Sequence, residues 1–308
     1  MSLALIFPGQ GSQIVGMAQA LTASEPAAED VLRLADEILG VPLSRLMAEG
    51  PEDELTATKN AQPAILAHSV AILRIVQDRL GPVAFTAGHS LGEFSAHVAA
   101  GTLRFEDALT AVRLRGQLMY DAGLERPGTM AAVLGLDDPT VTEVCERVDR
   151  GVCVPANFNA PGQVVVSGDV DGVKQFAEMA PEAGAKKVVL LNVSGAFHSP
   201  LMEPATEGLR AHLEGIEFRD PDVPVVSNVT ARPVTMAAEA RDLLVSQLTF
   251  PVRWSASVDT MVEAGVDRFL ELGPGKVLSG LNKRNAKGVP SIHVGEPDDL
   301  ESLEEIGL

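Results

Sequence analysis

Short runs of consecutive apolar residues alternate along most of this chain with longer stretches in which apolar residues recur every three or four positions. The first pattern is typical of strands buried on both faces and the second of amphipathic helices. Strands are expected at residues 3–7, 83–87, 224–227 and 268–271. Helices are expected at residues 27–39, 63–80, 93–100, 105–120, 199–213, 237–248 and 255–264. Strands that alternate with helices predict a mainly parallel α/β sheet.

The middle of the chain has a different order of elements. After Arg126-Pro127-Gly128 the pattern predicts strand, helix, two strands, helix and strand, which is the ferredoxin-like order β-α-β-β-α-β. We therefore predict an α/β-hydrolase-like parallel-sheet domain with an inserted ferredoxin-like (α+β) small domain. The large domain is discontinuous and covers 1–125 and 195–308, and the small domain covers 126–194. The acidic tail from Gly295 is expected to be a weakly held surface segment.

Composition excludes several classes of protein. Hydrophobic residues make up 46% of the 308 residues, which is enough for a sizeable core. The net charge of −18 repels phosphate backbones and anionic lipid, and only 4% of the residues are aromatic, so no nucleic acid or membrane binding is expected. Two cysteines without zinc-like spacing predict neither a disulfide framework nor a metal site. The start of the chain lacks a basic segment, and we expect a cytoplasmic protein.

Residues 88–92, Gly-His-Ser-Leu-Gly, fit the nucleophile-elbow pattern G-x-S-x-G. The pattern is common by chance, but here it joins an expected strand to an expected helix. Such a tight bend requires flanking glycines and lifts the Ser90 hydroxyl out at the carboxyl end of the sheet. The alternative is a plain glycine-rich turn with an ordinary helix-capping serine. The context favours Ser90 as a nucleophile.

A serine hydroxyl needs a base to take its proton, and His198 is the preferred candidate. It follows an expected strand and precedes a helix, so it lies at the sheet edge where open α/β folds place their sites. His89 lies inside the elbow and is expected to make a structural hydrogen bond. The remaining candidates are His68, His97, His212 and His293. No acid has a distinctive setting among Asp259, Asp267 and Glu271, so we predict a Ser–His dyad.

A second glycine-rich turn, Phe-Pro-Gly-Gln-Gly-Ser-Gln at 7–13, follows the first strand. It matches neither phosphate-binding glycine motif. Its functional interpretation is a loop that brings a backbone N–H and the Gln10 amide to an oxyanion. Its alternative is a strand-end turn followed by a helix cap.

These motifs, taken together and in order, resemble the malonyl-CoA:acyl carrier protein transacylases. The resemblance runs from Leu3 to about Lys283. Besides the motifs above, it rests on Arg115-Gly116, Gly-Ala-Phe-His at 195–198, Gln247, and the segments 157–163, 227–230 and 251–254. It implies that Ser90 is the nucleophile and that His198 is the general base and then acid. It also implies that Gln10 and the backbone N–H of Leu91 form the oxyanion hole.

The resemblance assigns three further roles. The backbone carbonyl of Gln247 would orient His198, which suits a site without a triad aspartate. Arg115 would pair with the free carboxylate of malonate, and Phe197 would favour malonyl over methylmalonyl. A guanidinium matches a carboxylate with two parallel hydrogen bonds, so arginine suits this task. Without the resemblance, Arg113 and Arg115 would rank equally, since they face different ways on one helix.

The implied reaction is ping-pong transfer of malonyl from malonyl-CoA to the phosphopantetheine thiol of acyl carrier protein in fatty acid biosynthesis. It would need no metal or cofactor and would be carried out by a monomer. Both substrates are anionic, so a local basic rim is expected at Lys186, Lys187, Lys276, Lys283, Arg284 and Lys287, unless these are dispersed surface charges. The alternatives are a serine thioesterase or esterase, a freestanding malonyl acyltransferase of a polyketide synthase, and a catalytically silent binding module.

Overall fold

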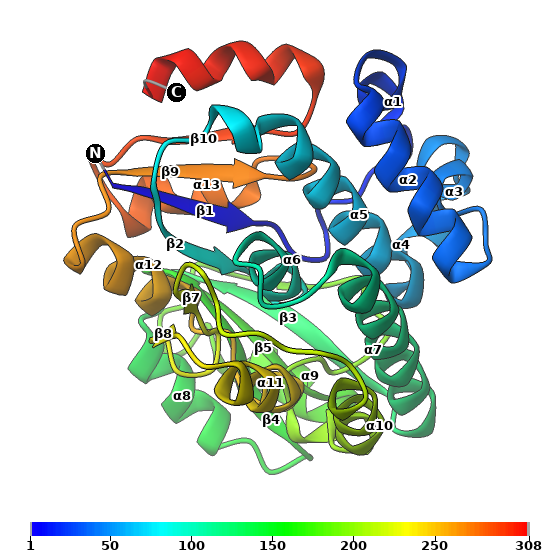
Figure 1. Ribbon diagram of the computed structural model, residues 1–308. Coiled ribbons are helices and arrows are strands. Elements are labelled where there is room, and N and C mark those ends of the chain that lie inside the picture. The colour runs from blue at the N-terminus through cyan, green and yellow to red at the C-terminus, as the bar shows by residue number, and fades with distance from the viewer. Residues whose placement is uncertain (1, 307–308) are drawn as a thin grey trace.

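The computed structural model describes the backbone of residues 2–306 and shows a six-stranded sheet at the centre of the larger part of the molecule (Figure 1). Its strands, in spatial order, are β10 (Ser291–Val294), β9 (Arg268–Leu272), β1 (Leu3–Phe7), β2 (Val83–Gly88), β7 (Val225–Val226) and β8 (Pro233–Val234). All neighbours are parallel except β7 and β8, which pair antiparallel. The expected parallel α/β sheet is thereby confirmed.

The central strand β1 shows why its sequence is a continuous apolar run. Leu3, Leu5 and Phe7 point into one hydrophobic core, and Ala4 and Ile6 point into another on the opposite face. A strand buried on both faces cannot carry the alternating polar residues of a half-exposed strand. The sheet therefore provides a rigid support for the loops that follow the carboxyl ends of its strands.

Helices pack against both faces of this sheet. The core that contains Leu3 and Phe7 also receives side chains from α1 (Gln19–Ser24), α2 (Pro26–Leu39), α3 (Leu43–Glu49), α4 (Glu52–Thr56), α5 (Thr58–Val76), α6 (Gly92–Ala99), α7 (Phe105–Glu125), α10 (Pro204–Glu214) and α11 (Ala237–Ser246). The opposite core is covered by α12 (Trp254–Glu263) and α13 (Val277–Asn285). Short 3₁₀ segments are η1 (Gln77–Arg79), η2 (Pro200–Met202) and η3 (Pro297–Ile306). No helix in the described part of the chain is long and apolar enough to cross a membrane.

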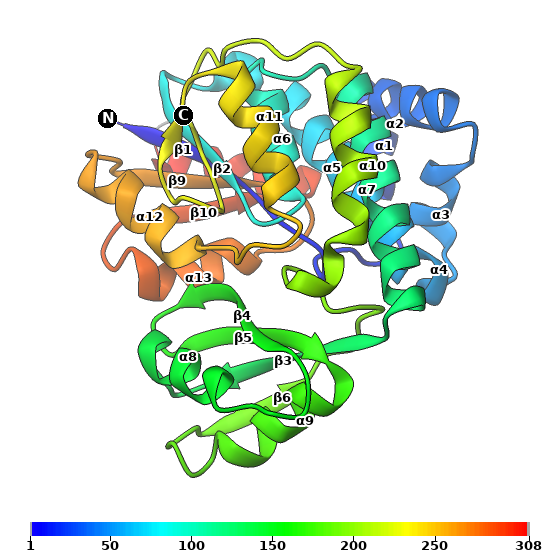
Figure 2. The same cartoon turned by 90° about the horizontal axis from the view of Figure 1, so that it is seen from below.

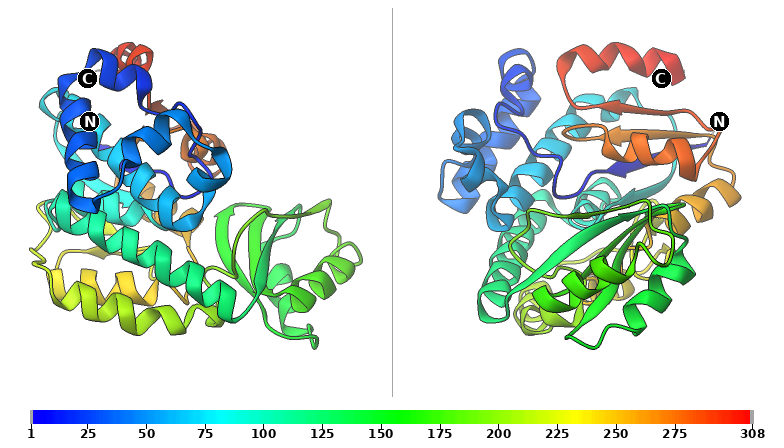
Figure 3. Two further views of the ribbon diagram at one scale, coloured as in Figure 1. Left: turned by 90° about the vertical axis from the view of Figure 1, so that its right-hand side faces the viewer. Right: turned by 180° about the vertical axis from the view of Figure 1, so that it is seen from behind.

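The smaller unit is a separate antiparallel sheet with two helices on its outer face (Figures 2 and 3). The strands, in spatial order, are β4 (Cys153–Ala160), β5 (Gln163–Asp169), β3 (Gly128–Leu134) and β6 (Lys187–Leu190), and the helices are α8 (Asp138–Glu146) and α9 (Val170–Met179). This is the β-α-β-β-α-β order that the sequence predicts. The limits 126 and 194 remain a prediction, which the separate core of this unit supports.

The two units are joined by backbone hydrogen bonds as well as by the chain. Val252 donates to the carbonyl of Ala156 at 2.8 Å, and Phe158 donates to the carbonyl of Val252 at 2.9 Å. These bonds extend the edge strand β4 into a loop of the large unit. Asn285 Nδ2 adds a bond of 2.9 Å to the carbonyl of Asn159.

Two elements differ from the sequence prediction for clear physical reasons. Helix α5 begins at Thr58, five residues before the expected start at Pro63, so the proline lies inside a helix. Pro63 has no N–H to give to the carbonyl of Lys59 four residues earlier. That carbonyl instead accepts a 2.7 Å hydrogen bond from Arg113 on α7, which allows the helix to tolerate the proline.

The C-terminal tail is the second difference, since η3 packs against β10 rather than lying loosely on the surface. Leu303 is fully buried, and the Asp299 carboxylate accepts hydrogen bonds from the backbone N–H groups of Gly295 and Glu296. The segment is mainly acidic, so its composition did not indicate that a buried leucine, Leu303, would hold it in place. The sequence prediction also missed α13 and β10, which precede it.

Candidate active site

The nucleophile elbow is present between β2 and α6, and its two glycines are required by close packing. A Cβ at Gly88 would lie 1.9 Å from the backbone of Gly92, and a Cβ at Gly92 would lie 2.2 Å from the carbonyl oxygen of Phe7. Ser90 itself has a φ of 52°, in the left-handed region that non-glycine residues rarely adopt. Such strain is typical of functional sites. The Ser90 hydroxyl does not cap α6, which has no side-chain cap hydrogen bond, so the alternative of an ordinary capping serine does not hold.

The Ser90 hydroxyl lies 2.8 Å from Nε2 of His198, which is in hydrogen-bond distance. The other ring nitrogen, Nδ1, lies 2.8 Å from the backbone carbonyl oxygen of Gln247. A carbonyl only accepts, so Nδ1 carries the proton and Nε2 presents its lone pair to Ser90. Ser90 and His198, 108 positions apart in the sequence, thus form one hydrogen-bonded chain with the Gln247 carbonyl.

Burial keeps His198 neutral. Its side chain is almost fully enclosed, and burial together with the nearby charge of Arg115 lowers the pKa of its imidazole to about 3. A neutral imidazole at physiological pH is the form that can accept a proton. His198 also has a φ of 56°, so both members of the dyad occupy left-handed backbone positions.

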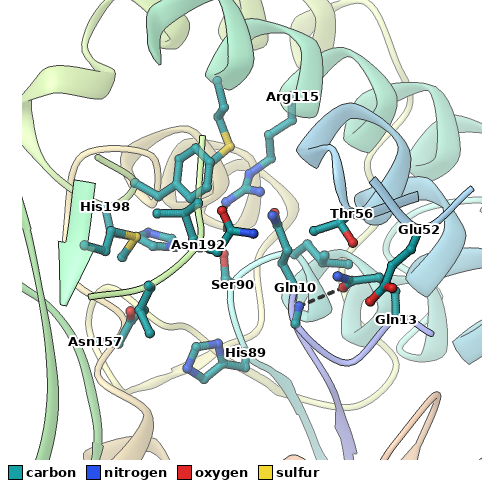
Figure 4. A pocket seen from close by; sticks show the side chains of 17 residues that line it. Gln10, Gln13, Glu52, Thr56, His89, Ser90, Arg115, Asn157, Asn192 and His198 are labelled. Carbon is teal, nitrogen blue, oxygen red and sulfur yellow. Dashed lines mark hydrogen bonds between the residues drawn. The ribbon is translucent and has the colours of Figure 1, made fainter. Parts of the chain in front are cut away.

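Arg115 projects from α7 toward the dyad and is only 1% exposed (Figure 4). One terminal nitrogen donates to Oε1 of Gln62 at 2.7 Å, and the other donates to Oε1 of Gln247 at 2.9 Å and to the Ser90 hydroxyl at 3.2 Å. Burial lowers its pKa to about 10, so the guanidinium stays charged at neutral pH. Arg113 instead bonds the carbonyl of Lys59 and is a structural residue. The structure therefore separates the two arginines.

The dyad opens into a pocket of about 530 Å³ between the large unit and the small sheet. Gln10, Leu91 and Phe197 line it, as the sequence analysis predicts. Gln10 is anchored by its Oε1, which accepts a 2.8 Å hydrogen bond from the Thr58 hydroxyl. Leu91 is the N-cap residue of α6, at the positive end of the helix dipole, where a backbone N–H is suited to bind an oxyanion.

The pocket wall is completed by residues of both units and of the entrance helix α4. They are Gly11, Gln13, Glu52, Thr56, His89, Met119, Met130, Asn157, Leu191, Asn192 and Val193. The apolar members suit a short acyl chain, and Arg115 is the cation at the inner end beside Ser90. This combination suits an acyl group that carries its own negative charge.

A buried polar network beneath the elbow was not found from the sequence. Glu93, on the first turn of α6, is 1% exposed, and burial raises the pKa of its carboxyl to about 7. It accepts hydrogen bonds from the backbone N–H of Asn228 and from Nε2 of Gln247. The signal for this network that the sequence offered was one acid, Glu93, among the mostly small and apolar residues that follow the elbow.

Of the other histidines, only His89 lines the pocket. His89 Nε2 is 2.8 Å from Oδ1 of Asn159, which confirms its expected structural hydrogen bond. His68 and His97 are buried in the core, His212 lies 3.3 Å from the Thr110 hydroxyl, and His293 pairs with Asp299.

The three acids that the sequence left open as triad members do not line the pocket. Glu271 accepts from the backbone N–H groups of Leu278 and Ser279, and Asp267 accepts from that of Ser2. Asp259 lies on α12 and is not among the residues that line the pocket. The carbonyl of Gln247 occupies the place of a triad acid. Among the described residues, no group of histidines, cysteines and acids is arranged to hold a metal.

Comparison with known proteins agrees with this geometry. The family model "Acyl transferase domain" matches residues 4–295. The malonyl CoA-acyl carrier protein transacylase of Bacillus subtilis is 46% identical and covers 97% of this chain and 95% of its own. The Escherichia coli K12 enzyme of the same name is 43% identical, covering 98% and 99%.

Solved structures agree as well. An acyl carrier protein S-malonyltransferase from Vibrio cholerae superposes with a TM-score of 0.94 at 42% identity, covering 98% of this chain and 99% of its own. A malonyl-transacylase in complex with its type II PKS acyl-carrier protein gives 0.96 at 42% identity, with full coverage of both chains. The chain therefore belongs to the acyl transferase domain family and, within it, to the malonyl-CoA:acyl carrier protein transacylases.

Proposed function

We propose that Ser90 carries the malonyl group between two thiols in a ping-pong reaction. The chain is an acyltransferase of the malonyl-CoA:acyl carrier protein class, and its site has the parts that such a reaction needs. The observation that carries this proposal is the continuous hydrogen-bonded chain from Ser90 through His198 to the Gln247 carbonyl.

In the first half-reaction, the Ser90 oxygen attacks the thioester carbonyl while His198 Nε2 takes the hydroxyl proton. The tetrahedral oxyanion is stabilised by the backbone N–H of Leu91 and by Gln10. The carbon–sulfur bond then breaks, and the proton on His198 passes to the departing CoA thiolate. The product is malonyl-Ser90, an ester.

In the second half-reaction, His198 takes the proton of the phosphopantetheine thiol as its sulfur attacks malonyl-Ser90. The ester bond breaks, and His198 returns the proton to the Ser90 oxygen. Throughout both steps, Arg115 pairs with the distal carboxylate of malonate, and its fork holds the acyl group in one orientation. Phe197 closes the apolar wall beside the α-carbon and favours malonyl over methylmalonyl.

The direct test is intact-mass measurement after incubation with malonyl-CoA. The wild-type chain should gain one malonyl group on Ser90, and Ser90→Ala should gain none. Adding holo acyl carrier protein should discharge the ester to the carrier. Loss of the acyl group to water as fast as to the carrier would favour the thioesterase alternative, and no acylation would indicate a silent binding module.

We propose a fatty acid synthesis carrier as the physiological acceptor, in line with the names of the curated relatives. The structural relative that binds a type II PKS carrier supports the second candidate, a polyketide synthase carrier. Parallel transfer assays with one carrier of each kind measure kcat/KM for both. A preference for the polyketide carrier would overturn the proposed acceptor and leave the chemistry unchanged.

Further parts of the proposal concern the state of the enzyme. We expect a cytoplasmic monomer that needs no metal or cofactor and binds neither nucleic acid nor membrane. The basic residues at 276–287 remain candidates for the carrier-binding rim. Size-exclusion chromatography with light scattering tests the monomer, and activity after exhaustive EDTA treatment tests the absence of a metal requirement.

A further inference from the structure

Glu93 is a buried acid to which the mechanism above gives no role. Its carboxylate Oε2 accepts hydrogen bonds from Gln247 Nε2 at 2.5 Å and from the backbone N–H of Asn228 at 3.1 Å. The Ser227 hydroxyl bonds the same carboxyl, and Arg115 is close enough to interact with it electrostatically. Burying a carboxyl group is costly without such partners, so this site is built around the acid.

The two residues held by Glu93 are those that fix the dyad. The Gln247 carbonyl accepts a hydrogen bond from His198 Nδ1–H, and the side-chain Nε2 of Gln247 donates to the carbonyl of Ser90 at 3.1 Å. The Oε1 atom of the same carboxamide accepts from Arg115. A rotation of this carboxamide would therefore disturb the nucleophile and the arginine, and the backbone carbonyl of the same residue holds the base.

Asn228 fixes the elbow itself. Its Oδ1 accepts from the backbone N–H of Ser90 at 2.7 Å, and its Nδ2 donates to the carbonyl of Gly88 at 2.7 Å. The side chain thus bridges the strained turn on both sides of His89. The backbone N–H of Asn228 donates to Glu93, so Glu93 holds the residue that forms this bridge.

We propose that Glu93 is a positioning residue for acyl transfer, which holds Gln247 and Asn228 and through them aligns His198 with the Ser90 hydroxyl. This inference rests on the proposed roles of Ser90 and His198. Glu93 touches neither of the reacting atoms. Its carboxylate joins the loop after β7, the C-terminal end of α11 and the elbow helix α6.

The test compares Glu93→Ala, Glu93→Asp and Glu93→Gln in single-turnover acylation by malonyl-CoA. Misplacement of a reacting group by about 1 Å costs on the order of 100-fold in rate, so the alanine variant should lose about 100-fold in kcat with little change in KM. Aspartate keeps the charge but is one methylene shorter, so it should lose about 10-fold. Glutamine can accept both hydrogen bonds on its Oε1 and donate to Ser227, so it should retain most of kcat.

A second measurement tests the reactivity of the Ser90 hydroxyl in the absence of malonyl-CoA. A fluorophosphonate probe labels the activated serine, and its labelling rate should fall in the alanine and aspartate variants in the same order as kcat. If the alanine variant does not fold, the aspartate and glutamine variants decide the question.

Glu271 offers a matched control. It is also fully buried, and burial also raises its pKa. It accepts two hydrogen bonds as Glu93 does, although both come from backbone N–H groups, and it lies on β9 and does not line the pocket. Glu271→Ala and Glu271→Asp should lower the melting temperature and leave kcat of the folded enzyme within about two-fold.

Three results would overturn the proposal. They are wild-type kcat in Glu93→Asp, an equal loss of kcat in the folded Glu271 variants, and a loss in Glu93→Gln as large as in Glu93→Ala. If the wild-type chain itself forms no ester at Ser90, the proposed function fails first and this inference fails with it. An ester on Ser90 combined with any of the three results removes the positioning role alone.

Discussion

Arg113 and Arg115 lie two positions apart on α7, and the fold gives them unrelated tasks. Arg113 satisfies the carbonyl that Pro63 leaves without an N–H partner, whereas Arg115 is enclosed beside Ser90. A buried guanidinium whose donors meet neutral carboxamides is a strong site for an anion, because its charge is not cancelled by a direct ion pair. We expect the carboxylate of malonate to be that anion.

We expect Arg115→Ala to lower malonyl transfer far more than acetyl transfer. One hydrogen bond to a charged group contributes about 1.5–3 kcal/mol, so the malonyl-to-acetyl ratio of kcat/KM should fall by about 10- to 150-fold. Acetyl transfer should also fall somewhat, because Arg115 donates to the Ser90 hydroxyl. Arg113→Ala is the matched control and should leave the ratio unchanged. Equal losses for both acyl groups would remove the carboxylate-binding role.

The sequence predicted the two residues that meet in the Ser90–His198 hydrogen bond better than the residues that support them. The strand–turn–helix context identified Ser90, and the position after a strand favoured His198. The two hydrogen bonds of Glu93 connect residues 135 and 154 positions apart, and no local pattern encodes such pairs. Periodicity likewise shows which face of a helix is apolar, but not which arginine the tertiary structure will bury.

The elbow between β2 and α6 is the element on which the site depends. Its glycines bring the backbone of β1 and the start of α6 so close that no side chain fits between them. This packing holds the left-handed φ of Ser90 in place. Strain at one residue is therefore maintained by the fit of the whole element.

Gly88→Ala should destabilise the fold by several kcal/mol and displace Ser90, because its Cβ would lie 1.9 Å from backbone. The expected result is a large drop in the denaturation midpoint and loss of acyl-enzyme. Gly280→Ala is a suitable control, since Gly280 lies within α13 and a Cβ there meets nothing within 4 Å. It should be neutral or stabilise the fold by about 0.4–1 kcal/mol. A Gly88→Ala chain that still forms the ester at the normal rate would contradict the steric argument.

Elements with a strong apolar pattern were predicted well, and those defined by tertiary contacts were not. β1, β2, β9, α2 and α7 begin where the sequence places them, within a residue or two. α5 was cut at Pro63 because the partner that makes this proline tolerable comes from another helix. β10 was missed because it is only four residues long, and η3 was missed because its buried anchor, Leu303, lies among acidic residues.

Across the whole molecule, the core contains several histidines that are held neutral. Burial lowers the pKa of His68 to about 4 and that of His97 to about 3, and His198 behaves in the same way. An unfolded chain takes up protons at these groups near pH 6.5, while the folded chain does not. Folding is therefore favoured above pH 6.5, and this contribution is lost as the pH falls toward the folded-state values.

We expect His68→Gln to reveal this effect. Between pH 6.5 and about 4, each buried neutral histidine should lower the free energy of unfolding by about 1.4 kcal/mol per pH unit. Glu93 and Glu271, whose pKa values are raised, act in the opposite direction, so the difference between wild type and variant is the informative quantity. Urea unfolding at pH 7.5, 6.5 and 5.5 should show a shallower decline for His68→Gln. Identical declines for both chains would show that His68 titrates normally.

The global arrangement was partly readable from the sequence. The change of element order after residue 126 predicted the inserted sheet, and the alternation on either side predicted one discontinuous parallel sheet. The hydrogen bonds that fasten β4 to Val252 could not be predicted, because they join a strand edge to a loop almost 100 residues away. They place the small sheet against the segment that also carries Gln247.

The insertion also divides the chemistry of the protein between two stretches of chain. Ser90 precedes the small sheet and His198 follows it, and the exposed turn at Gly184 lies between them. A chain cut at this turn would yield two pieces, each holding half of the dyad, which pair through β3 and β6 when they meet. Neither piece alone could form the ester, so the recovered activity would measure the fraction of pieces that have reassembled. A chain divided at this turn would therefore be a split reporter, and the recovered acyl transfer would be its signal.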